Sequence, residues 1–206
     1  MDFKILRLIL GDYQVNCYIV FDEENNAVII DPGAEANKII KAVKEHNLNV
    51  KYIILTHAHP DHFGALDEVR REFKVKAYLS EDDSEMLANR SSQINGMLGL
   101  DTPPLKADIL VNDGDLIEFR DKNFKVIATP GHTPGGICLL LDNVLFSGDT
   151  LFYGSIGRTD LPGGDYDTII KSLHKLMELD KDTIVLPGHG SETNIEFERA
   201  NNPFLK

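Results

Sequence analysis

The sequence predicts an α/β fold, because short apolar strands and amphipathic helices follow one another twice along the chain in a similar order. Such a repeat of elements favours two sheets placed face to face with helices outside, a four-layer αββα sandwich. The 206 residues, 42% of them hydrophobic, suit one domain with a sizeable core, and no linker rich in serine, glycine or proline divides them. Residues 1–206 are therefore expected to form a single domain.

In the first half of the chain, strands are expected at residues 3–9, 14–20, 27–31, 52–55 and 75–79, and helices at residues 35–47, 63–73 and 81–89. Turn-forming pairs, Gly11–Asp12 and Asn25–Asn26, separate the first three strands. On the first helix, Ile39, Ile40 and Val43 form an apolar stripe with lysines outside it. Each of these patterns is typical of an element with one buried face.

The second half repeats this order. Strands are expected at residues 116–120, 124–128, 137–141, 143–146 and 183–186, helices at 167–178 and near 191–200, and an irregular glycine-rich stretch at 154–164. Between the halves, residues 91–106 are rich in serine, glycine, asparagine and proline. We expect them to form a loop that could cover a functional site.

Charge and composition exclude several classes of function. The formal net charge of −12 works against attraction to nucleic acid or to an anionic membrane surface. No apolar run reaches the roughly 18 residues that cross a bilayer, and Lys4 and Arg7 interrupt the first apolar stretch, which reads as a strand rather than a signal peptide. Cys17 and Cys138 stand in apolar strands and are expected in the core. These features favour a cytoplasmic protein that acts on a small molecule, without nucleic-acid or membrane partners.

A cluster of metal-binding residue types follows the strand at 52–55. The sequence T-H-A-H-P-D-H at residues 56–62 contains His57, His59, Asp61 and His62. His57 and His59 are two positions apart, which in an extended backbone points both imidazoles to one side. Imidazole and carboxylate groups together suit zinc, iron, manganese or cobalt. A solvated polar loop is the alternative, but it does not account for the rest of the pattern.

Three further candidate ligands also follow apolar strands: His132 after residues 125–128, Asp149 after 143–146, and His189 after 184–186. A glycine directly precedes each of the three, where the backbone can turn sharply or approach closely. The two remaining histidines, His46 and His174, lie in helical stretches and are expected at the surface. Loops at one edge of a rigid sheet are where functional sites are built, so we expect the candidate ligands to meet there.

Seven ligands exceed the needs of one tetrahedral ion and suit two divalent ions, about 3.5–4 Å apart, that share a carboxylate and a water. Zinc is the expected metal, and iron or manganese accept the same ligands. Water between two cations loses a proton near neutral pH and becomes a nucleophile. The sequence has no G-x-S-x-G elbow, no P-loop and no recognisable cysteine–histidine pair. The pattern therefore predicts a metal-dependent hydrolase.

The motif H-x-H-x-D-H at residues 57–62, with the later ligands in their order, resembles the metallo-β-lactamase superfamily over nearly the whole chain. The resemblance implies a metal site at one edge of the two sheets. It assigns His57, His59 and His132 to the first metal, and Asp61, His62 and His189 to the second, with Asp149 bridging. Asp61 and Asp149 are then the expected catalytic carboxylates. Asp31, in I-I-D-P-G, matches a position that supports the site without ligating the metal.

Within the superfamily the chain most resembles short bacterial members of the glyoxalase II branch, which hydrolyse glutathione thioesters. The segments GDTLF (148–152), GSIGRTDLPGGD (154–165), LPGHG (186–190) and ERANNPF (198–204) carry this resemblance. It implies cleavage of a hydroxyacylglutathione-type thioester by a metal-bound hydroxide. Only 17 residues follow His189, so the C-terminal helical domain that helps longer members bind glutathione is expected to be absent. Another thiol carrier or a different thioester could therefore be used.

Two residues are candidates for substrate binding. The guanidinium of Arg158 could clamp a substrate carboxylate through two hydrogen bonds. Equally, it could form a buried ion pair with Asp160 or Asp165 that fixes the glycine-rich loop. Tyr153 is the weaker candidate, with packing as its alternative role.

Other activities in this superfamily fit the residues less well. Persulfide dioxygenases also resemble the sequence, and by that resemblance one iron held by His57, His132 and Asp149 would act on glutathione persulfide. The best-known β-lactamase subclass has a cysteine in place of Asp149, and flavodiiron proteins usually have a glutamate in place of His59. The processing nucleases carry RNA-binding elements not found here. A purely structural metal site would be closed and four-coordinate. The sequence leaves the oligomeric state open.

Overall fold

The computed structural model describes residues 3–99, 101 and 103–206. The chain forms two compact units: one comprises the residues up to 79 together with 84–110, and the other comprises 80–83 together with 111–206. Each unit contains one six-stranded sheet of mixed parallel and antiparallel strands, so the predicted α/β class is confirmed. Within the described residues, no helix has both the length and the apolar character needed to span a membrane.

The sheet of the first unit runs in the order β1 (Phe3–Leu10), β2 (Val15–Asp22), β3 (Asn26–Ile30), β4 (Asn49–Ile54), β5 (Lys76–Ser80) and β6 (Ile109–Val111). Strands β1 to β3 form an antiparallel meander, whereas β3, β4 and β5 run parallel to one another. Ile30 at the end of β3 pairs with Ile54 at the end of β4. The loops that follow these two strands therefore leave the same edge of the sheet.

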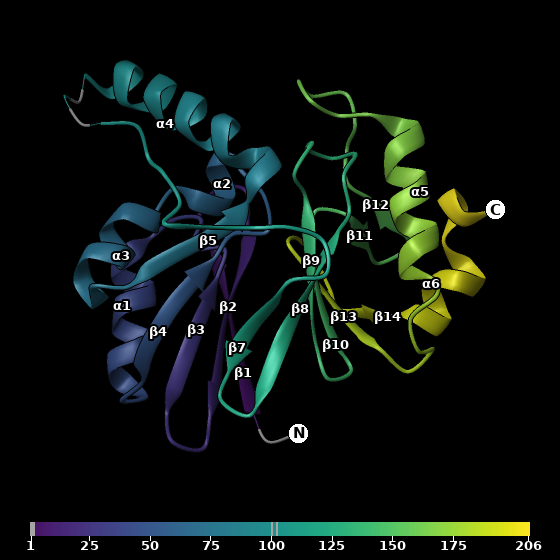
Figure 1. The fold of residues 1–206 in the computed structure, drawn as a ribbon, viewed down its shortest axis with the longest axis horizontal. Helices are drawn as coiled ribbons and strands as arrows, with labels where there is room; N and C mark the ends of the chain where they lie inside the picture. Colours follow the sequence, from purple (N-terminus) through teal and green to yellow (C-terminus); the bar gives the residue numbers. More distant parts are fainter. Residues whose placement is uncertain (1–2, 100, 102) are drawn as a thin grey trace. The chain divides into compact units, whose positions relative to one another are not determined.

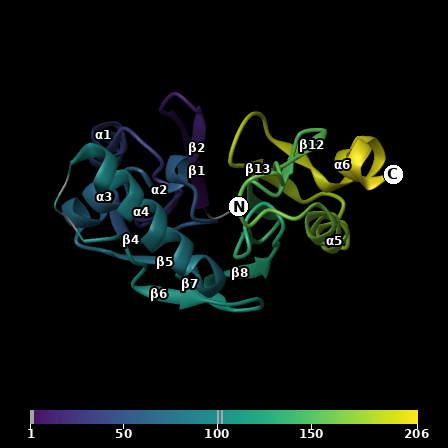
Figure 2. The same cartoon turned by 90° about the horizontal axis from the view of Figure 1, so that it is seen from above.

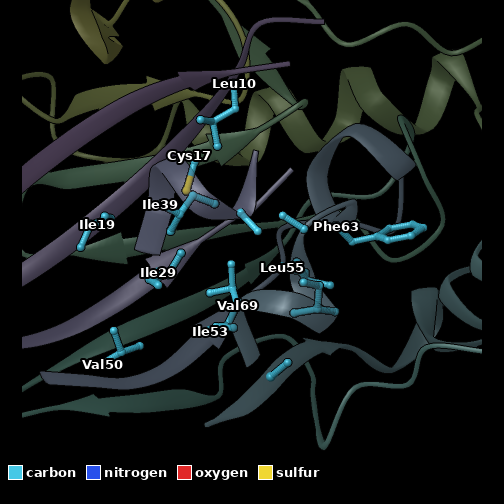
Figure 3. Close-up of a cluster of buried hydrophobic side chains, with 14 of the residues drawn as sticks. Leu10, Cys17, Ile19, Ile29, Ile39, Val50, Ile53, Leu55, Phe63 and Val69 are labelled. Carbon is cyan, nitrogen blue, oxygen red and sulfur yellow. The ribbon is translucent and has the colours of Figure 1, made fainter. Parts of the chain in front are cut away.

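Helices α1 (Ala36–Glu45) and α3 (Leu66–Phe73) lie on one side of this sheet in both views (Figure 1 and Figure 2). Ile39 of α1 and Val69 of α3 are fully buried, and they pack with inward-facing residues of β2 and β3 such as Cys17 and Ile29 (Figure 3). The first unit also contains the one-turn helix α2 (Pro60–Phe63) and the longer α4 (Ser84–Leu98). This core makes the sheet edge a rigid base for the loops that leave it.

The sheet of the second unit runs in the order β14 (Thr193–Asn194), β13 (Ile184–Pro187), β10 (Val144–Gly148), β9 (Ile137–Leu141), β8 (Lys122–Ala128) and β7 (Leu116–Phe119). Helices α5 (Tyr166–Leu176) and α6 (Ile195–Asn201) lie on one side of this sheet (Figure 1). Leu173 of α5 and Ile195 of α6 pack with Cys138 and Leu145 in the core of this unit. A separate hairpin joins β11 (Leu151–Phe152) to β12 (Ser155–Ile156).

The expected elements are present, with shifts of a few residues at their ends, and the differences are informative. The helix expected at 63–73 is divided into α2 and α3. The helix expected at 81–89 begins as a 3-10 helix, η1 (Glu81–Asp83), and continues as α4. The short strands β6 and β14 and the β11–β12 hairpin were not expected, because a strand of two or three residues has too few positions to show a period.

The loop expected at residues 91–106 is wrong for its first part, because α4 continues to Leu98. Ser91 is buried, its hydroxyl donates to the carbonyl oxygen of Ala88, and it accepts the backbone N–H of Leu105. Ser91, a polar residue inside the helix, therefore binds the segment that follows the helix. The polar composition of this stretch was interpreted as a loop, although part of it serves this contact. Positions 100 and 102 of the expected loop lie outside the described residues.

Both cysteines are buried and unoxidised, as expected of core residues. Burial raises the pKa of the Cys138 thiol to about 11, and it raises the pKa of Cys17 well above its usual range. Neither thiol is therefore ionised near neutral pH, which agrees with a packing role.

Replacement of Ile39 by alanine tests the core beneath the first sheet. Ile39 is fully buried, so Ile39→Ala should lower the free energy of unfolding by about 2–5 kcal/mol. Lys41→Ala on the exposed face of the same helix should change it by less than about 0.5 kcal/mol. Denaturant titration followed by circular dichroism would measure both changes, and equal effects would contradict this account of the core.

Candidate metal centre

Four of the seven predicted ligands lie in the first unit, just beyond the ends of two parallel strands. His57, His59, Asp61 and His62 follow β4, and Asp31 follows the neighbouring strand β3. The backbone N–H of Asp31 donates to the carbonyl oxygen of Ile54, which holds the two strand ends together. The strand-end placement predicted from the sequence is confirmed for this set.

Asp31 is the centre of a buried hydrogen-bond network that holds two of these histidines. Its carboxylate accepts the backbone N–H of Thr56 at 2.8 Å and the hydroxyl of Thr56 at 2.7 Å. It also lies 2.9 Å from Nδ1 of His62. The Thr56 hydroxyl lies 3.0 Å from Nδ1 of His57. Asp31 therefore supports His62 directly and His57 through Thr56, in keeping with its expected supporting position.

The three histidine rings of this unit lie close together. The ring centroids of His57 and His59 are 4.9 Å apart, and those of His57 and His62 are 4.1 Å apart. All three side chains are buried, whereas the side chain of Asp61 retains 24% of its exposure. The Asp61 carboxylate lies 3.8 Å from Nε2 of His62. Four potential ligand groups thus meet at one sheet edge.

Close backbone packing fixes the position of Asp61. A Cβ atom on Gly33 would lie 1.6 Å from the carbonyl oxygen of Asp61, so only glycine permits this approach. The backbone N–H of Ala65 donates to the carbonyl oxygen of Pro32 and joins the same two segments. The turn after β3 therefore packs directly against α2, which carries Asp61 and His62.

A hollow of about 340 Å³ adjoins Asp61 in the first unit. It is lined by the turn of the β1–β2 hairpin, the turn after β3 and the start of α2: Leu10, Gly11, Asp12, Tyr13, Gly33, Ala34, Pro60 and Asp61. Apolar groups and backbone provide most of its surface, and a volume of this size suits part of a small molecule. No residue-level pattern in the sequence predicted this hollow.

The other three predicted ligands meet in the second unit. His132, Asp149 and His189 follow β8, β10 and β13, as the sequence predicted. One carboxylate oxygen of Asp149 lies 3.5 Å from Nε2 of His132 and 3.6 Å from Nε2 of His189. His132 is buried and His189 keeps 26% of its side-chain exposure. A carboxylate between two imidazole nitrogens is suited to contact more than one cation.

The loop after β12 holds His132 and Asp149 from one side. Nδ1 of His132 lies 2.7 Å from the backbone carbonyl oxygen of Arg158. A Cβ atom on Gly157 would lie 1.7 Å from the carbonyl oxygen of Asp149 and 3.2 Å from Cγ of His132. The backbone at Gly157 therefore packs against both predicted ligands, and this contact requires glycine.

Asp83 supports the His132 loop from a second direction and was missed in the sequence. Its buried carboxylate accepts the hydroxyl of Thr133 at 2.9 Å and the backbone N–H of Gly135 at 2.7 Å. Asp83 is 49 positions before His132, and nothing in its local sequence marks it. Thr56 was also missed, although it directly precedes the first histidine of the motif.

The two predicted substrate-binding residues have partners of their own. Arg158 is exposed and donates from Nε and Nη2 to the two carboxylate oxygens of Asp160, both at 2.7 Å. This ion pair lowers the pKa of Asp160 to about 2. The alternative expected for Arg158 was a buried ion pair with Asp160 or Asp165. The pair with Asp160 is present, but it is exposed and not buried. Asp165 instead caps α5 by accepting the N–H of Thr168.

Tyr153 is 57% exposed, and its ring stacks on Phe197 with centroids 4.7 Å apart. This contact agrees with the packing role that was its expected alternative. His46 and His174 are both exposed, as predicted for surface residues.

The hydrogen bonds of three histidines show that their rings fit a metal ion as ligands. The carboxylate of Asp31 and the carbonyl of Arg158 can only accept, so Nδ1 of His62 and Nδ1 of His132 are donors. The Thr56 hydroxyl gives its proton to Asp31 and therefore accepts from Nδ1 of His57. In each neutral ring, Nε2 then carries the lone pair that a metal requires.

Comparison with known proteins places these observations in a family. Residues 10–189 match the sequence profile of the Metallo-beta-lactamase superfamily. The chain is 40% identical over 200 residues to a Haemophilus influenzae protein named hydroxyacylglutathione hydrolase GloC, with 94% of this chain and 93% of that protein covered.

Solved structures of similar proteins extend the likeness to the fold. BLEG-1, described as a B3 metallo-beta-lactamase, is 39% identical, covers 98% of this chain and 99% of its own, and has a TM-score of 0.88. TTHA1623 in a di-iron-bound form is 35% identical, covers 97% and 100%, and has a TM-score of 0.85. ETHE1 from Myxococcus xanthus is 28% identical, covers 97% and 83%, and has a TM-score of 0.83.

Substitution of Asp31 tests the support of the first ligand set. In Asp31→Asn, an amide N–H must face either the Thr56 N–H or the donors of His62 and Thr56, so at least one contact is lost in either orientation. Asparagine tolerates the left-handed backbone at this position, where φ is 51°. We expect metal affinity to fall by about 10–100-fold in chelator competition. The exposed variant Glu45→Gln should bind metal like the parent protein, and an unchanged affinity for Asp31→Asn would refute this role.

Proposed function

Because the chain belongs to the metallo-β-lactamase superfamily, we propose that its seven predicted ligands bind two divalent metal ions and that it hydrolyses a thioester of the hydroxyacylglutathione type. Its fold, two mixed sheets with helices, is that of the superfamily, as predicted. The chain is thus a metallohydrolase by family, and its substrate is the part proposed here.

The observation that carries the proposal is the fixed orientation of the histidine rings. Three of them donate Nδ1–H to a fixed oxygen and so present Nε2 as a ligand atom. In the assignment implied by family membership, His57, His59 and His132 hold one ion, and Asp61, His62 and His189 hold the other. Asp149, with a carboxylate oxygen near the Nε2 atoms of two histidines, is the proposed bridging ligand.

Two bound ions would supply an activated water and a Lewis acid for the scissile carbonyl. The chain's own residues orient these groups: Asp31 and Thr56 fix the rings of the first unit, and the Arg158 carbonyl fixes His132. Asp61 is among the residues that line a mostly apolar hollow, which we propose accommodates part of the thioester. No side-chain nucleophile is required, and both cysteines are buried and protonated near neutral pH.

A thioester is the proposed substrate because the Haemophilus influenzae relative, aligned along nearly the whole chain, is named a hydroxyacylglutathione hydrolase. Arg158 is the proposed partner for a carboxylate of the substrate, for which it would exchange Asp160. Tyr153 is a weaker candidate, since its ring already stacks on Phe197. A cytoplasmic location and a lack of nucleic-acid or membrane partners stay predictions from the sequence.

Metal analysis of protein purified without added metal, combined with activity assays, tests the proposal. We expect about two ions of zinc, iron or manganese per chain and hydrolysis of hydroxyacylglutathione-type thioesters. One iron per chain, with oxygen consumption on glutathione persulfide, would establish the dioxygenase alternative instead. Hydrolysis of β-lactams without thioesterase activity would also overturn the proposed substrate.

Removal of the proposed bridging ligand should abolish both metal binding and turnover. Asp149→Ala deletes the carboxylate near Nε2 of His132 and His189, so we expect less than one ion per chain and a loss of activity of at least about 1,000-fold. His174→Ala, on the exposed face of α5, should alter neither quantity. Metal content by elemental analysis and initial rates would decide, and full activity of Asp149→Ala would contradict the bridging assignment.

The role of Arg158 is tested by its effect on KM. Arg158→Ala removes the guanidinium but keeps the backbone carbonyl that contacts His132, so metal content should not change. We expect the KM for an acidic thioester to rise about tenfold, with a smaller change in kcat. Arg71→Ala removes another exposed arginine paired with an aspartate and should leave KM unchanged. A parent-like KM for Arg158→Ala would leave the pair with Asp160 as its only role.

A further inference from the structure

Glu198 on helix α6 is a buried carboxylate that none of the predicted ligand sets uses. Its side chain is fully buried in the second unit. It accepts the hydroxyl of Thr193 at 2.6 Å, the side-chain amide of Asn202 at 2.8 Å, and the backbone N–H of Gly154 at 3.1 Å from both of its oxygens. Burial of a carboxylate is unfavourable unless such donors surround it, so its place in the interior requires an explanation.

Glu198 contacts the β11–β12 hairpin at Gly154. Gly154 forms the turn of this hairpin, with a left-handed φ of 61°. Asn202, also buried, joins in by donating its amide N–H to the carbonyl oxygen of Ser155 at 3.1 Å. Glu198 and Asn202, one helical turn apart, thus hold Gly154 and Ser155, the two residues that follow Tyr153. These contacts span more than 40 positions of sequence.

The same hairpin leads directly to the backbone that contacts two predicted ligands. Strand β12 ends at Ile156, and the next two residues are Gly157 and Arg158. The backbone at Gly157 packs on the carbonyl oxygen of Asp149, and the carbonyl of Arg158 accepts Nδ1–H of His132. A displacement of the hairpin would therefore move the oxygen that sets the orientation of the His132 ring.

We propose that Glu198, together with Asn202, is a positioning residue for His132: it fixes the β11–β12 hairpin so that the Arg158 carbonyl holds the imidazole with Nε2 available to the metal. The role is exerted through hydrogen bonds and not through charge. An amide in place of the carboxylate can still accept from Gly154 and Asn202 while it donates to the Thr193 hydroxyl. The expected effect on metal binding rests on the function proposed above. The effect on the His132 ring is expected in the metal-free protein and does not depend on that function.

The first test is made on the metal-free protein by nitrogen-15 NMR of the histidine rings. In the parent protein the Nδ1 proton of His132 should exchange slowly with water, because it is bonded to the Arg158 carbonyl at 2.7 Å. Glu198→Ala should lose this slow exchange, whereas Glu198→Gln should retain it. Asn202→Ala offers a second route to the same hairpin if Glu198→Ala does not fold. Glu196→Gln, an exposed carboxylate in the same helix, is the matched control and should match the parent.

The second test measures metal affinity by chelator competition with zinc. Glu198→Ala should bind zinc about tenfold more weakly than the parent, and Glu198→Gln within about threefold of it. A purely structural role would lower the melting temperature of Glu198→Ala but leave its His132 exchange and zinc affinity, both measured well below that temperature, unchanged; this result would overturn the proposal. If the parent itself bound no zinc, iron or manganese, the proposed function would fail, and the His132 measurement would still decide the role of Glu198.

Discussion

The donation of an Nδ1 proton to a fixed oxygen is the interaction on which the proposed metal centre depends. A histidine is preorganised to bind a cation through Nε2 when its ring is held in one tautomer and one orientation. Three histidines of this chain meet that condition through Asp31, Thr56 and the carbonyl of Arg158. The sheets, the glycine contacts and the buried carboxylates all act to keep those oxygens in place.

The two units reach the same result by different means. In the first unit the oxygens belong to a side chain. The Asp31 carboxylate lies just beyond β3 and accepts three hydrogen bonds from the segment that follows β4. In the second unit the oxygen belongs to the backbone, and its position depends on the loop that carries it. Asp83 and Glu198 are buried where they secure the segments around His132. Both arrangements rest on carboxylates that the interior has enclosed with donors.

The strand-end placement of the candidate ligands was predictable because its signal is local. Each stands directly after an apolar run, and His57, His59, Asp61 and His62 share one short motif. A residue that supports these candidate ligands was predictable only where it also follows an apolar strand, as Asp31 does. Asp83 and Glu198 are ordinary acidic residues in sequence, and their partners are distant in the chain, so only folding reveals them. The extension of α4 was misread for a related reason, because Ser91 has a tertiary partner that composition does not encode.

The backbone carbonyl at residue 158 orients His132, whereas the side chain at that position is the proposed contact for substrate. If one side chain served both purposes, a substitution there would change both. Every amino acid carries that carbonyl, so the residue at this position can be exchanged in evolution while the imidazole keeps its partner. The side chain is exposed and pairs with Asp160. Descendants of this chain could therefore change the side chain at position 158 without first losing the contact that orients His132 in the proposed metal centre.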